Sequence, residues 1–295
     1  MSLLTSAPIS ALAVELLRRQ LVLVNTVSRV PAGEYSGPSG GTVTLAVPTP
    51  RTAREQRTRG AQITYDPADE TPVNITLRHF YDGALISDEQ LSLDIRNFGR
   101  QVLAPQVESV ARAAEDQLAD AMNGLDPDPD ILWSGRPDPT ADRATVLAIR
   151  ERLTVNGCPP GNRWVSCAPD ITTRLLAVPG FTEADRRGST NALEAAEVGQ
   201  LYGLRFIESA ALDEGSAVAY HQSGFGFGTA VPVNPGGADS TTATEGGVSL
   251  RHILAFDPGH LSTASVVSVF VGAGVVPEDD EGTVKRAIRI ALGGS

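Results

Sequence analysis

The sequence is poor in lysine and cysteine, and each shortage excludes a class of chemistry. Lys285 is the only lysine, so 23 of the 24 basic residues are arginine. A nucleotide-binding loop of the P-loop type needs a lysine directly after its glycines, and the glycine-rich stretch 224–228 has none. Two cysteines in 295 residues exclude a disulfide framework and indicate a reducing compartment.

Long apolar runs are also missing. No stretch approaches the roughly 20 apolar residues that are needed to cross a bilayer. The run 266–276 is shorter, and its Val, Ser, Gly and Phe favour a buried strand. The first residues lack the pattern of a secretory leader. We therefore expect neither export nor insertion into a membrane.

Positive charge is scarce overall but concentrated near the N-terminus. The chain has a formal net charge of −11. Residues 1–60 hold seven arginines against three glutamates, a net of +4, which leaves −15 for the other 235 residues. A free nucleic-acid binder needs clustered basic residues to displace counterions from phosphates. A basic front and an acidic body instead favour self-association.

No constellation of catalytic or metal-binding residues stands out. The four histidines are scattered: we expect His79 and His252 to be structural residues of strands and His260 to face solvent. The acidic run 126–130 resembles the start of a calcium loop, but the required glycine and distal acid are replaced by Ile131 and Pro137. We predict no catalytic residues, no cofactor and no metal site. A soluble hydrolase stays open as an alternative, and a monomer in light scattering would favour it.

Apolar periodicity predicts a short helix over 8–21 and, after a loop over 31–41, a strand over 42–47. A second strand follows over 73–78. The intervening residues 49–72 are polar and contain four arginines, Arg51, Arg54, Arg57 and Arg59. Two strands around a long polar excursion predict an extended β-hairpin that leaves the body of the protein.

A long helix is expected over 88–124. The capping sequence 87–90 opens it, an apolar stripe at spacings of three and four follows, and Asn123-Gly124 ends it. Pro105 lies where the stripe loses its period, so we expect a kink there. At 1.5 Å per residue the helix would be about 55 Å long.

The rest of the chain is typical of an α+β arrangement. We read 126–139 as a stiff linker and the Gly, Ser and Thr-rich segment 233–247 as a second boundary. The expected helices cover 140–155, 170–178 with Asp170 as a cap, and 192–200; the expected strands cover 163–168, 204–208, 217–220, 248–256, 263–276 and 284–292. The glycines of 224–228 are expected to allow turns or close backbone approach, with Phe225 and Phe227 packing on one side.

Several of these stretches, taken in order, resemble a known family. They are Ile9-Ser-Ala-Leu-Ala-Val-Glu-Leu-Leu-Arg-Arg, Gly41-Thr-Val-Thr-Leu-Ala-Val-Pro, Ile86-Ser-Asp-Glu-Gln-Leu-Ser-Leu, Arg163-Trp-Val-Ser-Cys-Ala-Pro-Asp and Gly199-Gln-Leu-Tyr-Gly-Leu-Arg-Phe-Ile-Glu-Ser. Together with the order of the elements, they resemble the major capsid proteins of tailed double-stranded DNA bacteriophages. The Salmonella-phage type of coat protein is the most similar.

The resemblance implies an α+β, Hong Kong 97-like capsid fold and divides the chain accordingly. The implied parts are an N-terminal arm (1–40), an extended loop (41–81), a peripheral domain (82–140) with a spine helix (88–124), an axial domain (141–249) and a β-rich return (250–295). On this reading Arg51, Arg54, Arg57 and Arg59 make contacts between subunits.

The implied function is a shell of hexamers and pentamers around packaged DNA, bound without sequence specificity. Portal, scaffolding and possible decoration proteins would be its partners, the virion its location and the host cytoplasm the place of assembly. Some members weld their shells with a lysine–asparagine bond from the extended loop, but residues 41–81 contain no lysine, so noncovalent contacts are expected. An encapsulin-type compartment shell, which shares the fold, is the alternative.

Overall fold

The structure is a computed structural model. It describes residue 13 and residues 21–29, 41–48, 53–56, 58–60, 62–65, 70–90, 98–178, 197–234, 239–245, 248–278 and 282–293. Ala13 is helical and fully buried. Residues 8–12 and 14–20 of the expected N-terminal helix lie outside the described part of the chain.

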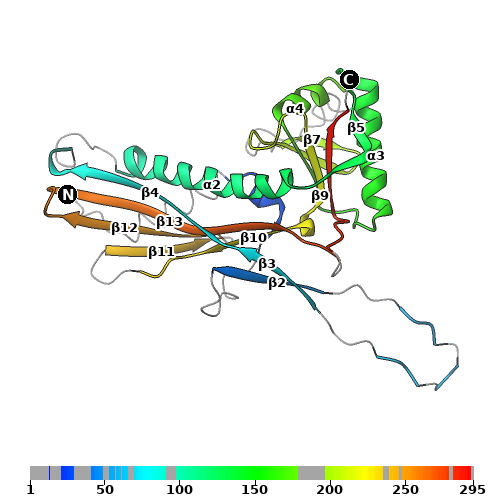
Figure 1. Ribbon diagram of the computed structural model, residues 1–295, viewed down its shortest axis with the longest axis horizontal. Coiled ribbons are helices and arrows are strands. Elements are labelled where there is room, and N and C mark those ends of the chain that lie inside the picture. The colour runs from blue at the N-terminus through cyan, green and yellow to red at the C-terminus, as the bar shows by residue number, and fades with distance from the viewer. Residues whose placement is uncertain are drawn as a thin grey trace.

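A long, narrow sheet forms one half of the molecule (Figure 1). Its path runs through β1 (Ser28–Arg29), β10 (Phe225–Ala230), β13 (Ser262–Val275), β12 (Val248–Asp257) and β11 (Asp239–Glu245), and β4 (Arg78–Ser87) also pairs with β13. The pairing of β4 with β13 is antiparallel, from Ser87 opposite Ser262 to Arg78 opposite Val271. The two strands expected over 248–256 and 263–276 are thereby confirmed.

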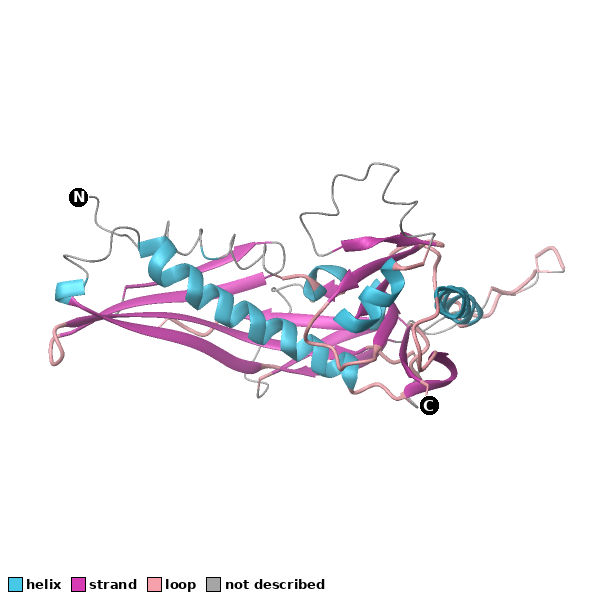
Figure 2. Cartoon of the chain, turned by 90° about the horizontal axis from the view of Figure 1, so that it is seen from above, coloured by secondary structure: helices cyan, strands magenta, loops and turns pink. Residues whose placement is uncertain are grey.

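The helix α2 (Ala104–Asn123) lies along one face of this sheet, as Figures 1 and 2 both show. Its buried side is the apolar stripe expected from the sequence, and alternate residues of β13 meet it. The buried members include Val107, Val110, Ala114 and Leu118 on the helix and Val267, Val269 and Val271 on the strand. The helical period of 3.6 and the strand period of 2 thus place these side chains in one core.

The segment before α2 explains how the chain accommodates Pro105. Ser87 and Gln90 form the expected reciprocal capping box, since the amide of each residue donates to the other's side chain at 3.2 Å. A π-helical turn, η4 (Gly99–Leu103), comes directly before α2 and places Pro105 in the first helical turn. The backbone is helical on both sides of Pro105, so the wider π-helical turn, and not a free helix start, lies where the proline has no amide to donate. The kink at Pro105 stays a prediction.

A second six-stranded sheet stands at one end of the first (Figure 1). Its order is β5 (Pro127–Trp133), β14 (Ala287–Leu292), β9 (Ala217–His221), β6 (Arg163–Cys167), β8 (Leu204–Glu208) and β7 (Glu197–Leu201). The helices α3 (Pro139–Val155) and α4 (Pro169–Leu176) belong to the same half. Their apolar residues share a core with this sheet, with Trp133, Phe206 and Ile149 fully buried.

Three expectations about strands and their boundaries were wrong, and all three concern edge strands. Residues 127–133 were expected to be linker but form β5, residues 239–245 were expected to be a boundary loop but form β11, and residues 197–200 were expected to be helical but belong to β7. Each lies at the end of its sheet's path. Edge strands pair on one side only, tolerate proline and carry polar residues, so they lack the apolar alternation that identifies a strand.

The two large sheets each combine strands from distant parts of the chain, and the domain boundaries expected at 140/141 and 249/250 stay a prediction. β5 joins the sheet of β6, β8 and β9, whereas β10 and β11 join the long sheet. These groupings arise from pairings between residues far apart in the chain, which no local pattern displays. Asp170 was expected to cap α4, but the cap residue is Ala168, and the Asp170 Oδ2 atom instead accepts from the Gly215 amide at 3.0 Å.

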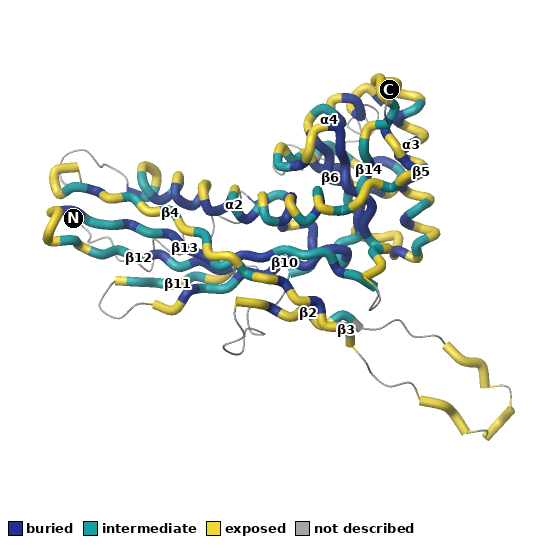
Figure 3. Tube along the Cα trace, in the orientation of Figure 1, coloured by how far each residue is buried: buried dark blue, intermediate teal, exposed yellow. Residues whose placement is uncertain are grey.

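The expected hairpin is present as a third, separate sheet. β2 (Thr42–Pro48) and β3 (Glu70–Thr76) pair antiparallel, from Thr42 opposite Thr76 to Pro48 opposite Glu70. Beyond these strands the described parts of the connection reach away from the body and are exposed (Figures 1 and 3). β4 begins at Arg78, so residues 78–81 of the expected extended loop belong to the long sheet.

Candidate functional site

Chemically reactive side chains are not gathered into a centre in the described part of the chain. It contains no group of three or more His, Cys, Asp or Glu that could hold a metal ion. Cys158 and Cys167 are buried, and burial raises the pKa of both thiols, which disfavours thiolates. No helix in the described part is long and apolar enough to cross a membrane.

The histidines have structural surroundings. His252 is fully buried beneath α2, where its Nε2 atom lies 3.0 Å from Ser265 Oγ, and burial lowers its pKa to about 4. It is therefore neutral at physiological pH. His260 is exposed and lies 2.6 Å from Asp257. Both match the expectations from the sequence. His79 is exposed on β4, and its ring packs against that of Phe270 with centroids 4.7 Å apart.

The acidic run at 126–130 serves as an anchor for α3. Asp128 and Asp130 both pair with Arg152, at 3.1 Å and 2.8 Å. A cation and two carboxylates thus join β5 to α3. The opposite charges explain why this acidic segment lies ordered against the helix instead of acting as a linker.

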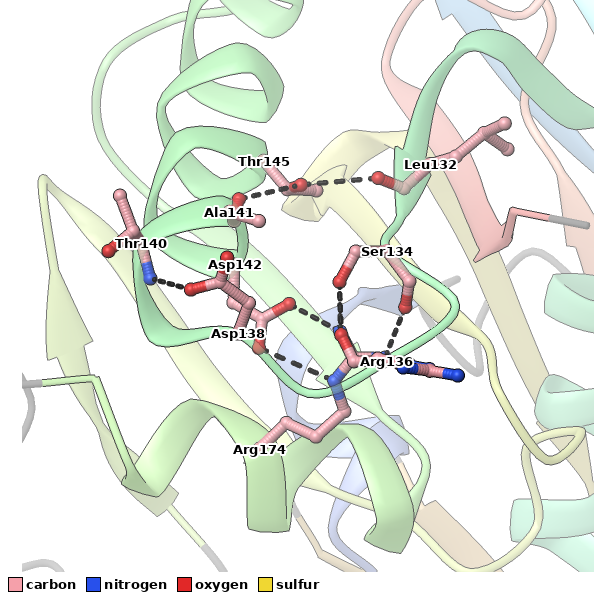
Figure 4. A network of polar contacts seen from close by, with 9 residues as sticks. All are labelled: Leu132, Ser134, Arg136, Asp138, Thr140, Ala141, Asp142, Thr145 and Arg174. Carbon is pink, nitrogen blue, oxygen red and sulfur yellow. Dashed lines mark hydrogen bonds and ion pairs between the residues drawn. The ribbon is translucent and has the colours of Figure 1, made fainter. Parts of the chain in front are cut away.

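A buried ion pair fixes the loop between β5 and α3 (Figure 4). The Arg174 guanidinium of α4 lies 2.5 Å from Asp142 Oδ1, and both side chains are more than 90% buried. The same guanidinium donates to the backbone oxygens of Ser134 and Arg136 at 2.8 Å and 3.3 Å. Asp138 caps α3 by accepting from the Thr140 amide. Arg174 of α4 therefore fixes the position of α3 and of the loop that leads from β5 into it.

The hairpin packs closely against two glycines of the long sheet, Gly226 and Gly272. The first of them belongs to the glycine-rich stretch 224–228. Val43 and Ile75 are buried where β2 and β3 meet the long sheet. A Cβ atom at Gly226 would lie 2.9 Å from the Ile75 side chain, and one at Gly272 would lie 2.5 Å from the Thr76 carbonyl oxygen. Only glycine allows the hairpin to lie so close to the sheet.

Two of the four arginines that were singled out from the sequence lie on the described far part of the hairpin. Arg54 and Arg59 are exposed, and Arg54 donates to the Thr64 carbonyl oxygen at 3.4 Å across the excursion. Arg51 and Arg57 lie outside the described residues. Ile63 and Tyr65 on the same excursion are 53% and 82% exposed. The hairpin thus presents cationic and apolar groups away from its own body, and contacts of the four arginines between subunits stay a prediction.

A second candidate site, missed by the sequence analysis, is the largely buried seam between the two halves of the molecule. Residues 21–29, here called the arm base, pass through this seam as a 3-10 turn, η1 (Leu23–Thr26), followed by β1. β1 pairs in parallel with β10. The Thr26 hydroxyl lies 2.6 Å from the Tyr220 hydroxyl, which in turn lies 2.9 Å from Ser166 Oγ. The arm base is therefore hydrogen bonded to both sheets.

Glu115 of α2 completes the seam. Its two carboxylate oxygens accept from the amides of Leu23 and Val24, at 2.8 Å and 3.3 Å. Burial raises the pKa of this carboxyl from 4.5 to about 7. The position of Glu115 in the sequence could have indicated this. Glu115 lies four residues after Ala111 and three before Leu118, both on the buried stripe of the helix, so its side chain is expected at the border of the core.

Comparison with solved structures identifies the fold. No known family matches the sequence, and no curated protein matches it either. Solved structures do match: one from Mycobacterium phage Che8 has 18% identity, covers 93% of this chain and 92% of that chain, and has a TM-score of 0.59. The capsid structure of the cyanophage P-SCSP1u has 13% identity over 93% of this chain and 89% of that chain, with a TM-score of 0.60.

A third match is a virus-like particle from Pyrococcus furiosus, with 9% identity, a TM-score of 0.52, and coverage of 97% of this chain and 98% of that chain. At such low identities the likeness bears on the fold alone. The chain has the α+β, Hong Kong 97-like fold of phage capsids, as the sequence resemblance implied.

Proposed function

We propose that the chain is a major capsid protein, the subunit of an icosahedral bacteriophage head made of hexamers and pentamers that encloses double-stranded DNA. The observation that carries the proposal is the likeness to phage capsid structures over about nine tenths of the chain. A role without catalysis is also part of the proposal. It is supported by His252, which is buried and hydrogen bonded, by the buried thiols, and by acidic residues that pair with arginines. In this proposal the virion is the protein's location, after assembly in the host cytoplasm.

The proposal keeps the division of labour that the resemblance implied. Residues 1–40 are the arm, 41–81 the extended loop, 82–140 the peripheral domain, 141–249 the axial domain and 250–295 the return. The chain's main partner is a second copy of itself. Portal, scaffolding and possible decoration proteins complete the head, and the Salmonella-phage type of coat protein is the proposed subfamily.

The hairpin arginines are the proposed contacts between subunits. Arg54 and Arg59 lie on described parts of a segment that reaches beyond its own body, and the remainder of the chain has an excess of acidic residues. An arginine fork that meets a carboxylate adds orientation as well as attraction. Because the hairpin holds no lysine, these contacts are noncovalent.

The test is a charge reversal in the hairpin. Arg54→Glu combined with Arg57→Glu is expected to block shell formation while the circular dichroism spectrum of the monomer is unchanged. Arg136→Glu with Arg150→Glu is the control, since it makes the same change in net charge on exposed residues of the other half. Normal particles from the hairpin variant would contradict the proposed contacts. Loss of assembly in both variants would assign the effect to net charge.

An encapsulin-type compartment is the second candidate, because a virus-like particle from Pyrococcus furiosus covers 97% of the chain. The contents of purified particles distinguish the two. Nuclease-resistant double-stranded DNA inside the particles favours the phage head, whereas a co-purifying cargo protein in place of DNA favours the compartment.

A further inference from the structure

The end of α2 lies where the two halves of the molecule meet, and residues 124–126 lead from it into β5 (Figure 1). Arg289 of β14 reaches this connection from the second half. Its Nη1 atom donates to the carbonyl oxygen of Asn123 at 2.7 Å and to that of Leu125 at 3.3 Å. The last carbonyl groups of a helix have no partner within the helix, and a cation beside them is favourable. One donor atom therefore holds a backbone oxygen on each side of Gly124.

The loop that follows β8 holds the guanidinium from another side. The Asp213 Oδ2 atom accepts from Nη2 of Arg289 at 2.7 Å. The Asn123 side chain binds the same loop, because its Nδ2 atom donates to the Ala211 carbonyl oxygen at 3.3 Å and its Oδ1 atom accepts from the Asp213 amide at 3.2 Å. These hydrogen bonds join the end of α2 to two parts of the second half, and each of them uses the side chain of Asn123 or Arg289.

Arg289 contributes orientation more than stability. Its side chain is 17% exposed, and its Nε atom is buried without a hydrogen-bond partner in the part of the chain that the structure describes. Withdrawing a cation from water costs free energy, and a buried donor without a partner adds to that cost. The hydrogen bonds of Nη1 and Nη2 offset this cost, and hydrogen bonds weaken steeply when they bend. The guanidinium therefore fixes the direction in which the end of α2 meets the second half.

Apolar packing holds the two halves together without fixing the angle between them. Met122 of α2 is buried in the same cluster as Leu212 and Val218 of the second half. Burial of apolar surface is favourable but non-directional, so it opposes separation of the halves more strongly than a small rotation. The angle therefore depends on directional contacts at the seam.

The crossing of the chain from β9 to β10 is held by backbone hydrogen bonds. It passes through η5 (Gln222–Gly224). The His221 amide donates to the Arg286 carbonyl oxygen at 2.9 Å, and the Val276 amide donates to the Gly224 carbonyl oxygen at 3.0 Å. These bonds do not involve the Arg289 side chain, so they persist when its guanidinium is removed. This crossing is therefore a fixed point about which the halves can turn.

We propose that residues 124–126 are a hinge between the two halves and that Arg289 is the positioning residue that locks it, with Asn123 and Asp213 as its partners. While Nη1 bridges the carbonyl oxygens of Asn123 and Leu125, the backbone of the hinge cannot rotate without breaking a hydrogen bond. Without the guanidinium, the halves stay attached through their shared core and sample a wider range of angles. The hinge goes beyond the proposed shell function and does not depend on it, because it operates within one chain.

A distance between the halves, measured by double electron–electron resonance, tests the lock. Spin labels are attached at Ser109→Cys on α2 and Thr173→Cys on α4, which are exposed positions, whereas the natural cysteines are buried. Labelled full-length protein is diluted with unlabelled protein, so only distances within one chain are recorded, whether or not the chain forms shells. Arg289→Met keeps an apolar stem and is expected to broaden the distance distribution. Arg152→Met, which removes an ion-paired arginine within the second half, should leave it unchanged.

An unchanged distribution in Arg289→Met would overturn the proposal, even if the midpoint of chemical denaturation falls, because an arginine that only stabilises the fold leaves the native distances as they are. Equal broadening in Arg152→Met would overturn it too. If Arg289→Met does not fold, Asp213→Ala replaces it, since Asp213 is 58% exposed and its loss leaves the guanidinium with its carbonyl partners alone. A broader distribution in that variant supports the lock, and an unchanged one contradicts it.

Discussion

Replacement of Gly272 by alanine tests whether the hairpin stays in place because it packs directly against this glycine. A Cβ atom there would lie 2.5 Å from the Thr76 carbonyl oxygen and 2.9 Å from the Ile75 side chain. A backbone oxygen so close has to move, and overpacking of this kind costs about 1–3 kcal/mol. Burial of Val43 and Ile75 stabilises the docked hairpin by roughly 3–6 kcal/mol, at about 1.5–3 kcal/mol for each side chain. The substitution should remove a substantial part of that stabilisation.

Because the hairpin is an outlying sheet, the loss should appear as local opening and leave global unfolding almost unchanged. Hydrogen exchange at amides 43–47 and 73–77 is the assay, and each 1.4 kcal/mol corresponds to about tenfold faster exchange. Gly274→Ala is the matched control on the same strand, since its Cβ would meet Ile75 Cγ1 at an ordinary 3.5 Å. Equal exchange in the two variants would refute the argument from close approach.

Two further predictions concern the buried ion pair and the covalent state of the shell. Asp142→Ala should lower the free energy of unfolding by about 3–5 kcal/mol, because it leaves the buried Arg174 guanidinium without its counterion, and chemical denaturation measures this. Asp130→Ala, which removes an exposed partner of Arg152, should cost no more than about 1 kcal/mol, and an equal loss in both variants would contradict the role of burial. Boiled, denatured particles should run as a single monomer band, since residues 41–81 hold no lysine, and a ladder of linked oligomers would disprove noncovalent bonding.

Local patterns predicted the elements whose faces are buried. The stripe from Val107 to Leu118, the strands around Phe206 and Tyr220, the hairpin strands and the reciprocal cap of Ser87 and Gln90 all have signatures within a few residues. The glycine stretch at 224–228 predicted turns or close backbone approach, and a Cβ atom at Gly224 would lie 2.7 Å from the Arg286 carbonyl oxygen. At Gly226 the near neighbour is a side chain, that of Ile75. This partner could not be named, because it comes from a hairpin about 150 residues earlier.

Features that depend on distant partners were not predicted. The acidic strand β5 is ordered by β14 and Arg152, so its proline-rich sequence alone indicated a linker. Asp170 was a plausible cap by position, but the Gly215 amide binds it. Glu115 bordered an apolar stripe, and its partners at Leu23 and Val24 lie on the far side of 90 residues of chain. In each case the deciding contact is tertiary.

Electron microscopy of the purified full-length protein tests the central claim most directly. If the chain is a shell subunit, the micrographs will contain closed icosahedral particles built from sixfold and fivefold clusters, each made of this one chain. A sample that stays a uniform monomer of 31.0 kDa, under conditions in which the protein is folded, would contradict the assignment to a capsid and to any compartment of the same fold.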